Sequence, residues 1–135
     1  MDYILDACAL IAFLNDEKEA AAVSNLLIRA ETGTDRLFMS SIQVLEVYYD
    51  RIYVKGIEYA DIFLKSLRTS PIVVLSEIST AIIREAGRFK TSYAMSLADS
   101  IAVATTKNLG AAIVTKDPEL KAAEEAGEYS VLWLQ

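Results

Sequence analysis

Histidine is absent from this sequence of 135 residues, and its absence limits the possible chemistry more than any other feature of the composition. Ser-His-Asp and Cys-His nucleophile systems are excluded, and so is a histidine general base. Zinc sites built with histidine are excluded as well. An enzyme with this composition must rely on carboxylates, hydroxyls, Lys, Arg, Tyr or a bound ion.

The sequence also has only one cysteine, and we find in it neither the pattern of a signal peptide nor a long apolar run. Cys8 is the only cysteine, so no internal disulfide forms; this fits a reducing cytoplasm, and we interpret Cys8 as a small buried apolar residue. The first residues, Met1-Asp2-Tyr3, lack the basic segment of a signal peptide. No uncharged apolar run approaches the ~18 residues of a membrane-spanning helix. We therefore expect a cytoplasmic protein without membrane association.

The length of the chain is typical of one domain, so we expect a single domain over residues 1–135. The net charge of −6 argues against a broadly basic nucleic-acid-binding face. A cluster of acids that binds cations would carry part of that charge, which weakens the argument. The mean hydropathy of +0.29 is high for a small protein and predicts that some apolar surface lies in a subunit interface.

Short apolar segments alternate with helical patterns along the chain. Capping boxes at Asp16 and Ser40 are expected to begin two of the helices. The alternation, with strands apolar on both faces, predicts an α/β fold in which helices cover both faces of a parallel sheet. The predicted strands are 3–5, 36–39, 71–75, 111–114 and 130–134, and the predicted helices are 9–14, 17–30, 40–54, 57–67, 78–90, 97–109 and 118–126.

Two aspartates lie just after predicted strands, at the end of the sheet where such folds bind their ligands. Asp6 follows the first strand directly, and Asp117 follows the fourth within Ile113-Val114-Thr115-Lys116-Asp117-Pro118. If strand one lies beside strand four, both carboxylates reach the same crevice. Each aspartate also has a structural interpretation as a helix N-cap, which proline after Asp117 favours.

Two further acids occupy helical positions. Asp99 fits a capping box in Ser96-Leu97-Ala98-Asp99, and a carboxylate in a first turn also favours the helix dipole. Glu46 lies in the middle of a predicted helix, where it has no capping role and no obvious cationic partner one turn away. The structural alternative for Glu46 is a solvated position at the border of the apolar face.

The four acids together favour a metal site. Carboxylates gathered at one end of a sheet repel one another unless cations lie between them. Oxygen ligands without His or Cys select hard ions, so we expect Mg²⁺ or Mn²⁺ rather than Zn²⁺. Such an ion activates water for attack on a phosphodiester, and a second ion about 4 Å away stabilises the leaving oxygen.

Several segments resemble the PIN-domain ribonucleases, and the resemblance extends over the whole chain. The first segment is Tyr3-Ile4-Leu5-Asp6 with Ala9-Leu10-Ile11-Ala12, and the second is Ser40-Ser41-Ile42-Gln43-Val44-Leu45-Glu46-Val47. The most specific is Ser96-Leu97-Ala98-Asp99-Ser100, followed by Gly110-Ala111 and Val114-Thr115-Lys116-Asp117. The length also resembles that of the VapC-like toxins of prokaryotic toxin–antitoxin pairs.

The resemblance implies a three-layer α/β/α fold with a five-stranded parallel sheet in the order 3-2-1-4-5. It implies that Asp6, Glu46, Asp99 and Asp117 bind the metal or position water, with Thr115 as a supporting hydroxyl. It also implies an RNA substrate, a homodimer with a shared groove and a possible antitoxin partner. Three positions depart from the family pattern and remove hydroxyl or aromatic groups: Ala7, Cys8 and Leu120.

Basic residues on helix faces are the candidates for contact with RNA. They are Arg51 with Lys55 and Arg84 with Arg88, each pair one helical turn apart, and Lys116. The structural alternative for each is a solvated charge beside an acid. Large apolar residues of the two helices between 40 and 67 are predicted to form core or dimer contacts rather than base-stacking surfaces: Tyr48, Tyr49, Tyr53, Tyr59, Phe63 and Leu67.

Other functions compete with the toxin nuclease. One is a PIN nuclease that processes RNA outside a toxin pair. A phosphatase with an aspartyl nucleophile requires Asp-x-Asp after the first strand, where Cys8 occupies the second position. A phospho-receiver requires an acceptor aspartate after a strand near the middle of the chain, where Ser76 follows Leu75. A binding module that kept the acids without activity is separated from an enzyme only by assay.

Overall fold

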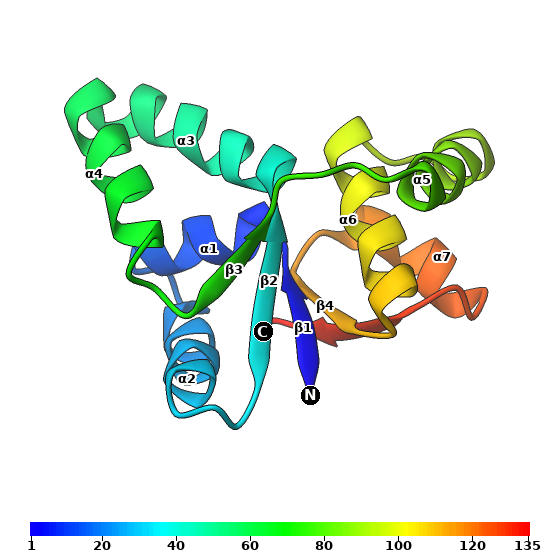
Figure 1. Ribbon diagram of the computed structural model, residues 1–135, viewed down its shortest axis with the longest axis horizontal. Helices are drawn as coiled ribbons and strands as arrows, with labels where there is room; N and C mark the ends of the chain where they lie inside the picture. The colour runs from blue at the N-terminus through cyan, green and yellow to red at the C-terminus, as the bar shows by residue number, and fades with distance from the viewer.

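Five parallel strands form one sheet in the order β3-β2-β1-β4-β5, in a computed structural model that describes residues 1–135 (Figure 1). The order reverses at β1, which pairs with β2 on one side and β4 on the other. This confirms the predicted sheet and places a crevice between the carboxyl ends of β1 and β4. The strands are β1 (Asp2–Leu5), β2 (Arg36–Ser40), β3 (Ile72–Leu75), β4 (Ala112–Thr115) and β5 (Ser130–Trp133).

Helices cover both faces of the sheet (Figure 1). Adjacent strand residues point to opposite faces, so Leu5 packs in one apolar core and Ile4 in the other. The first core lies under α1 (Ala7–Leu14), α2 (Ala20–Glu31), α3 (Ser41–Lys55) and α4 (Ile57–Leu67). The second lies under α5 (Thr80–Ser92), α6 (Leu97–Leu109), the 3₁₀ turn η1 (Pro118–Leu120) and α7 (Lys121–Glu125).

Two helix starts that position the acids depend on serine caps. The Ser40 hydroxyl accepts the Gln43 backbone N–H at 3.2 Å at the start of α3. The Ser96 hydroxyl accepts the Asp99 N–H at 3.1 Å at the start of α6. Each cap satisfies a backbone donor that has no partner within its helix. These bonds fix where α3 and α6 begin, upstream of Glu46 and at Asp99.

Two sequence predictions about the fold are wrong. Asp16 does not cap α2: it adopts a positive φ of 52°, and the helix begins at Ala20 after an N-cap, Glu19, whose side chain forms no capping bond. Strand β3 is not covered on both faces, because it lies at the edge of the sheet, where Val73 is 48% exposed and Val74 40% exposed. No helix is both long enough and apolar enough to cross a membrane.

Candidate functional site

The four acids singled out in the sequence meet in one cavity at the carboxyl end of the sheet. The cavity has a volume of about 370 Å³, and Asp6, Glu46, Asp99 and Asp117 all line it. They arrive from four separate segments: the end of β1, the middle of α3, the first turn of α6 and the loop after β4. The topology therefore brings together residues that span most of the chain.

A single hydroxyl joins two of these acids. Asp6 is only 2% exposed, and its Oδ2 accepts the Thr115 Oγ1–H at 2.7 Å. The same Thr115 hydroxyl accepts the Asp117 N–H at 3.0 Å. Cys8 is half-buried beside them, with its Sγ 3.4 Å from both Asp6 Oδ2 and Thr115 Oγ1. The Thr115 hydroxyl therefore connects Asp6 to the loop that carries Asp117.

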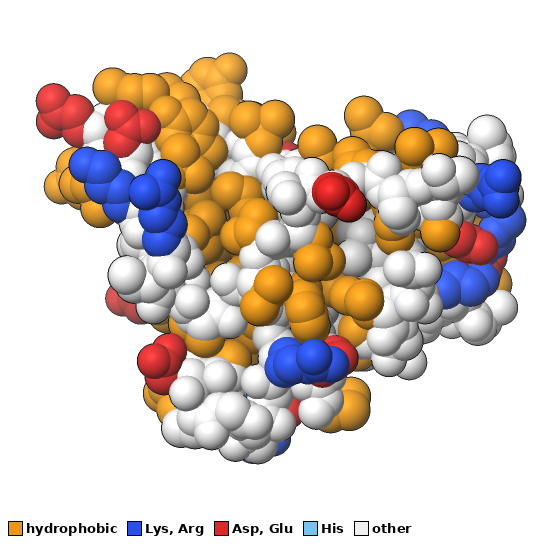
Figure 2. Space-filling model, viewed as in Figure 1, with side chains coloured by type: hydrophobic (Ala, Val, Ile, Leu, Met, Phe, Trp, Pro, Cys, Tyr) orange, Lys and Arg blue, Asp and Glu red, His pale blue; other side chains and the backbone are white.

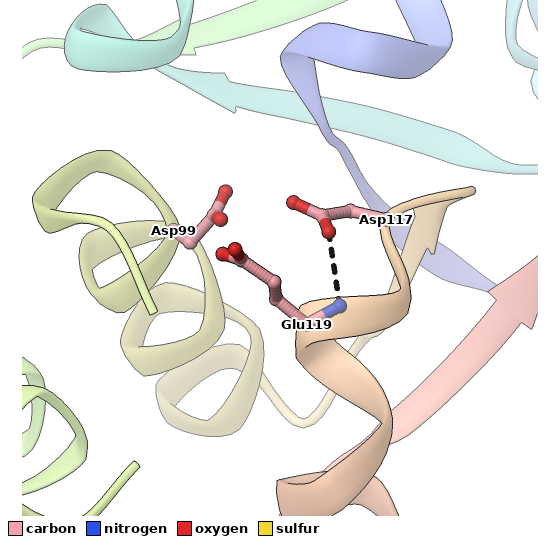
Figure 3. Close-up of side chains that lie close together, drawn as sticks. All are labelled: Asp99, Asp117 and Glu119. Carbon is pink, nitrogen blue, oxygen red and sulfur yellow. Dashed lines mark hydrogen bonds between the residues drawn. The ribbon is translucent and has the colours of Figure 1, made fainter. Parts of the chain in front are cut away.

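Both strand-end aspartates also cap helical segments. Asp6 Oδ1 accepts the Ala7 N–H at 2.8 Å, and Asp117 Oδ1 accepts the Glu119 N–H at 2.9 Å. In Figure 3 the second oxygen of Asp117 points toward Asp99. For Asp117 the structural and functional interpretations are thus compatible, because one oxygen forms the cap and the other is directed toward Asp99; the second oxygen of Asp6 accepts from Thr115 instead.

Two further acids line the cavity that the sequence prediction missed, Asp50 and Glu119. Carboxylate oxygens of Asp99, Asp117 and Glu119 all lie within 4.8 Å of one another (Figure 3). Asp50 lies one helical turn after Glu46 on α3, so the i, i+4 spacing was a signal that could have identified it. Glu119 had no such signal, because its direction depends on the turn η1.

The electrostatics of the cavity favour a bound cation. Burial, together with the charges of Asp6 and Asp117, raises the pKa of Asp99 to about 7. Burial also raises the pKa of Asp6 and, with the charge of Asp6 nearby, that of Glu46. No Lys or Arg lines the cavity. Apart from Asp50, which pairs with Arg51, these carboxylates have no counterion within the chain, and such a set fits a hard divalent ion such as Mg²⁺ or Mn²⁺.

A buried amide lies directly behind the acids. Gln43 is fully buried; its Oε1 accepts the Ala7 N–H at 2.8 Å, and its Nε2 donates to the Ala98 carbonyl at 3.1 Å. The sequence pattern predicted Gln43 as the partner of Ser40 in a capping box. Its side chain instead joins the start of α1 to the start of α6.

The predicted basic contacts divide into two groups. Arg51 is 5% exposed and donates to Asn15 Oδ1 at 2.7 Å and Asp50 Oδ2 at 2.8 Å, so its placement on an exposed basic face is wrong. Lys116 pairs with Glu17, and Arg88 pairs with Glu85 and Glu128. Lys55 and Arg84 are exposed and form no ion pair within the chain.

The aromatic residues of α3 and α4 also differ in their roles. Phe63 and Leu67 belong to the core. Tyr49 is 44% exposed, lines the acidic cavity and donates its hydroxyl to Glu46 Oε2 at 3.5 Å. Tyr53 is 86% exposed one turn further along α3, and Tyr59 is exposed on α4. Phe63 and Leu67 are therefore core residues, and dimer contact stays a prediction for the exposed tyrosines.

Comparisons with known proteins agree with this architecture. A model of the PIN-domain family matches residues 3–126 of the chain. VapBC2 from Rickettsia felis, bound to a DNA fragment from its promoter, has a TM-score of 0.75 at 16% identity, with 100% of each chain covered. VapBC-1 from nontypeable Haemophilus influenzae has a TM-score of 0.71 at 22% identity, covering 98% of this chain and 97% of that one.

A third similar structure is VapC20 of Mycobacterium tuberculosis, described as a Sarcin-Ricin loop cleaving toxin. Its TM-score is 0.70 at 14% identity, with 90% of this chain and 94% of that chain covered. None of the curated proteins matches the chain by sequence. At these identities the structural similarity is a similarity of fold.

Proposed function

The chain belongs to the PIN-domain family, and on that premise we propose that it is a Mg²⁺- or Mn²⁺-dependent endoribonuclease, the toxin of a toxin–antitoxin pair. The observation that carries the nuclease proposal is the convergence of six acids, without Lys or Arg, in one cavity at the carboxyl end of the sheet. The similarity of the fold to VapC20 and to the VapBC complexes supports the toxin role.

Asp6, Glu46, Asp99 and Asp117 would hold the ion, with Glu119 at the open rim. Such an ion, when bound, activates water for attack on a phosphodiester bond. The Thr115 hydroxyl bonds to the Asp6 carboxylate and to the backbone N–H of Asp117, and the Asp117 carboxylate uses one oxygen for its cap on Glu119. The protein thus presents carboxylates that are already positioned, which reduces the reorganisation needed when the ion binds.

RNA is the proposed substrate because a carboxylate site of this type acts on phosphodiesters, and VapC20 is described as cleaving an RNA loop. The exposed Lys55 and Arg84 are the remaining candidates from the predicted basic set to contact the backbone. The cavity itself carries no basic side chain. We therefore expect the affinity for RNA to depend on the divalent ion.

Two protein partners are proposed. The first is a second copy of the chain: hydrophobic side chains gather over α3 and α4 (Figure 2), where Val54, Ile57 and Ile62 are 53%, 53% and 60% exposed. A dimer would bury this surface. The second is an antitoxin, since the similar VapBC structures are complexes. We propose that the protein acts in the cytoplasm, where such partners and RNA are found.

Cleavage of RNA in the presence of Mg²⁺ or Mn²⁺ tests the proposal. We expect cleavage that stops when the ion is removed with EDTA and that falls by about 100-fold or more in Asp6→Asn, which removes one ligand charge. Glu31→Gln, an exposed position at the end of α2, is the control and should keep the wild-type rate. Full cleavage by Asp6→Asn, or in EDTA, contradicts the proposed function.

A further inference from the structure

The Gln43 side chain connects the two helix starts that carry Asp6 and Asp99. Ala7, whose N–H donates to Gln43 Oε1, directly follows Asp6, and Ala98, whose carbonyl accepts from Gln43 Nε2, directly precedes Asp99. One amide therefore connects the neighbour of Asp6 to the neighbour of Asp99.

The bridge requires an amide. A primary amide has an acceptor at one oxygen and donors at one nitrogen, and both are used here. Glu at position 43 would keep the acceptor but place a second oxygen against the Ala98 carbonyl. Met would keep the approximate volume and lose both bonds. The Ala7 N–H would keep its bond to Asp6 Oδ1, but the link between Ala7 and Ala98 would be lost, and because position 43 is fully buried we expect no water to replace it.

The bridge acts against a repulsion. Asp6 and Asp99 are buried acids of the same charge, and the charge of Asp6 is one of the causes that raise the pKa of Asp99. Without a cation between them, the starts of α1 and α6 are driven apart. Gln43 connects these two starts through its amide and is not among the residues that line the cavity.

We propose that Gln43 is a positioning residue that keeps Asp6 and Asp99 facing the same cavity before the ion arrives. The inference rests on the proposed function, because it takes the divalent ion as the ligand of these acids. It adds a residue to the site that neither touches the ion nor lines the cavity. Its effect on metal affinity comes from preorganisation, since the bridge offsets the cost of bringing the carboxylates together.

Metal binding by Gln43→Met is the first test, measured by calorimetry with MnCl₂ and MgCl₂ on the full chain at pH 8. We expect a Kd about 10–100-fold higher than that of the wild type, the range typical for residues that orient metal ligands. Thr106→Val is the matched control: Thr106 is also fully buried and its hydroxyl bonds to Ala102 O at 2.8 Å, but it lies two turns further along α6. Its Kd should stay within about twofold of the wild type.

A metal-free measurement separates positioning from ordinary loss of a buried hydrogen bond. In EDTA at pH 8, Gln43→Met should lower the midpoint of urea unfolding more in an Asp6→Asn background than in the wild type, because in the wild type the two charged acids can separate once the bridge is lost and this relief of repulsion offsets part of the loss. A purely structural role predicts equal losses in the two backgrounds. Gln43→Glu, which restores only the acceptor, should not recover metal affinity.

Three outcomes overturn the inference. One is a folded Gln43→Met that binds Mn²⁺ as tightly as the wild type, which leaves the proposed function intact. Another is an unfolding loss that is equal in the two backgrounds. The third is a wild type that binds neither ion, in which case the proposed function fails first and the inference falls with it.

Discussion

Two groups of acids in this molecule have opposite environments. The first group consists of Glu85 on α5 and Glu128 just before β5, and both pair with Arg88 and Lys107. Arg88 Nη1 lies 2.8 Å from Glu128 Oε2, and Lys107 Nζ lies 3.2 Å from Glu128 Oε1. The acids of the cavity have no Lys or Arg among the residues that line it with them.

The pKa values follow this difference. Hydrogen bonds from Arg88, Tyr93 and Lys107 lower the pKa of Glu128 to about 2, whereas burial and neighbouring acids raise the pKa of Asp99 to about 7. The first group has its counterions within the chain and stabilises the fold. Apart from Asp50, which pairs with Arg51, the acids of the second group lack counterions within the chain, so their charge is balanced by a proton or by an ion from solution. The presence or absence of counterions within the chain, and not the number of acids, therefore distinguishes the two groups.

The largest expected contrast comes from neutralising one acid of each group. Asp99→Asn should reduce Mg²⁺-dependent RNA cleavage by about 100-fold or more and raise the stability of the metal-free protein, because one repelling charge is lost. Glu128→Gln should leave cleavage unchanged and lower stability by about 1–2 kcal/mol, because it breaks charge-assisted bonds. Cleavage rates and urea unfolding of both variants provide the measurement. The contrast between the two groups fails if the variants behave alike.

Removing the counterion of the paired group is the next largest change. Arg88→Met should lower the free energy of unfolding by about 1–2 kcal/mol, since it leaves Glu85 and Glu128 with Lys107 alone. Arg84→Met, at an exposed position on the same helix without an ion pair, is the control and should change stability by less than about 0.5 kcal/mol. Equal urea midpoints for the two variants would show that the network adds no stability.

The pH dependence of stability distinguishes the groups without mutation. Asp99 has a higher pKa in the folded state than in the unfolded chain, so between about pH 4 and 7 the folded protein binds more protons. In EDTA, stability should therefore fall as the pH rises through this window, by about 1 kcal/mol after allowance for solvent screening. Mg²⁺ should restore it above pH 7. Thermal melts from pH 5 to 8 test this, and a rise of stability with pH in EDTA would contradict it.

The smallest expected effect concerns the exposed rim of the cavity. Glu119→Gln should weaken Mg²⁺ binding by about threefold, because solvent screens an exposed ligand more than a buried one. Glu125→Gln, an exposed acid at the end of α7, serves as the control. Calorimetry decides the matter, and a loss as large as that of Asp99→Asn would place Glu119 among the main ligands.

Much of the fold could be predicted because its signals are local. Apolar runs such as Ile72–Leu75, the caps Ser40 and Ser96, and Gly110 at a φ of 63° each act through neighbours in the chain. The failures were local signals that lost to tertiary contacts. Asp16 matches a capping pattern, but Glu17 and Glu19 in the same turn pair with Lys116 from the loop after β4. That pairing accompanies a start of α2 four residues after Asp16.

The positions of Asp6, Asp99 and Asp117 could be inferred from the sequence, because residues at strand ends and in first turns have directions that the backbone pattern specifies. Glu46, in the middle of α3, was included through its position beside the apolar face and the family resemblance. The sequence could not place Glu119, turn Gln43 into a bridge or bury Arg51, since each of these depends on which segments pack together. Side-chain partners and burial arise from contacts between distant residues, such as Gln43 with Ala98 and Arg51 with Asn15. Local spacing therefore determined which acids face the carboxyl end of the sheet, and packing between helices determined their separation, their pKa values and the groups that hold them.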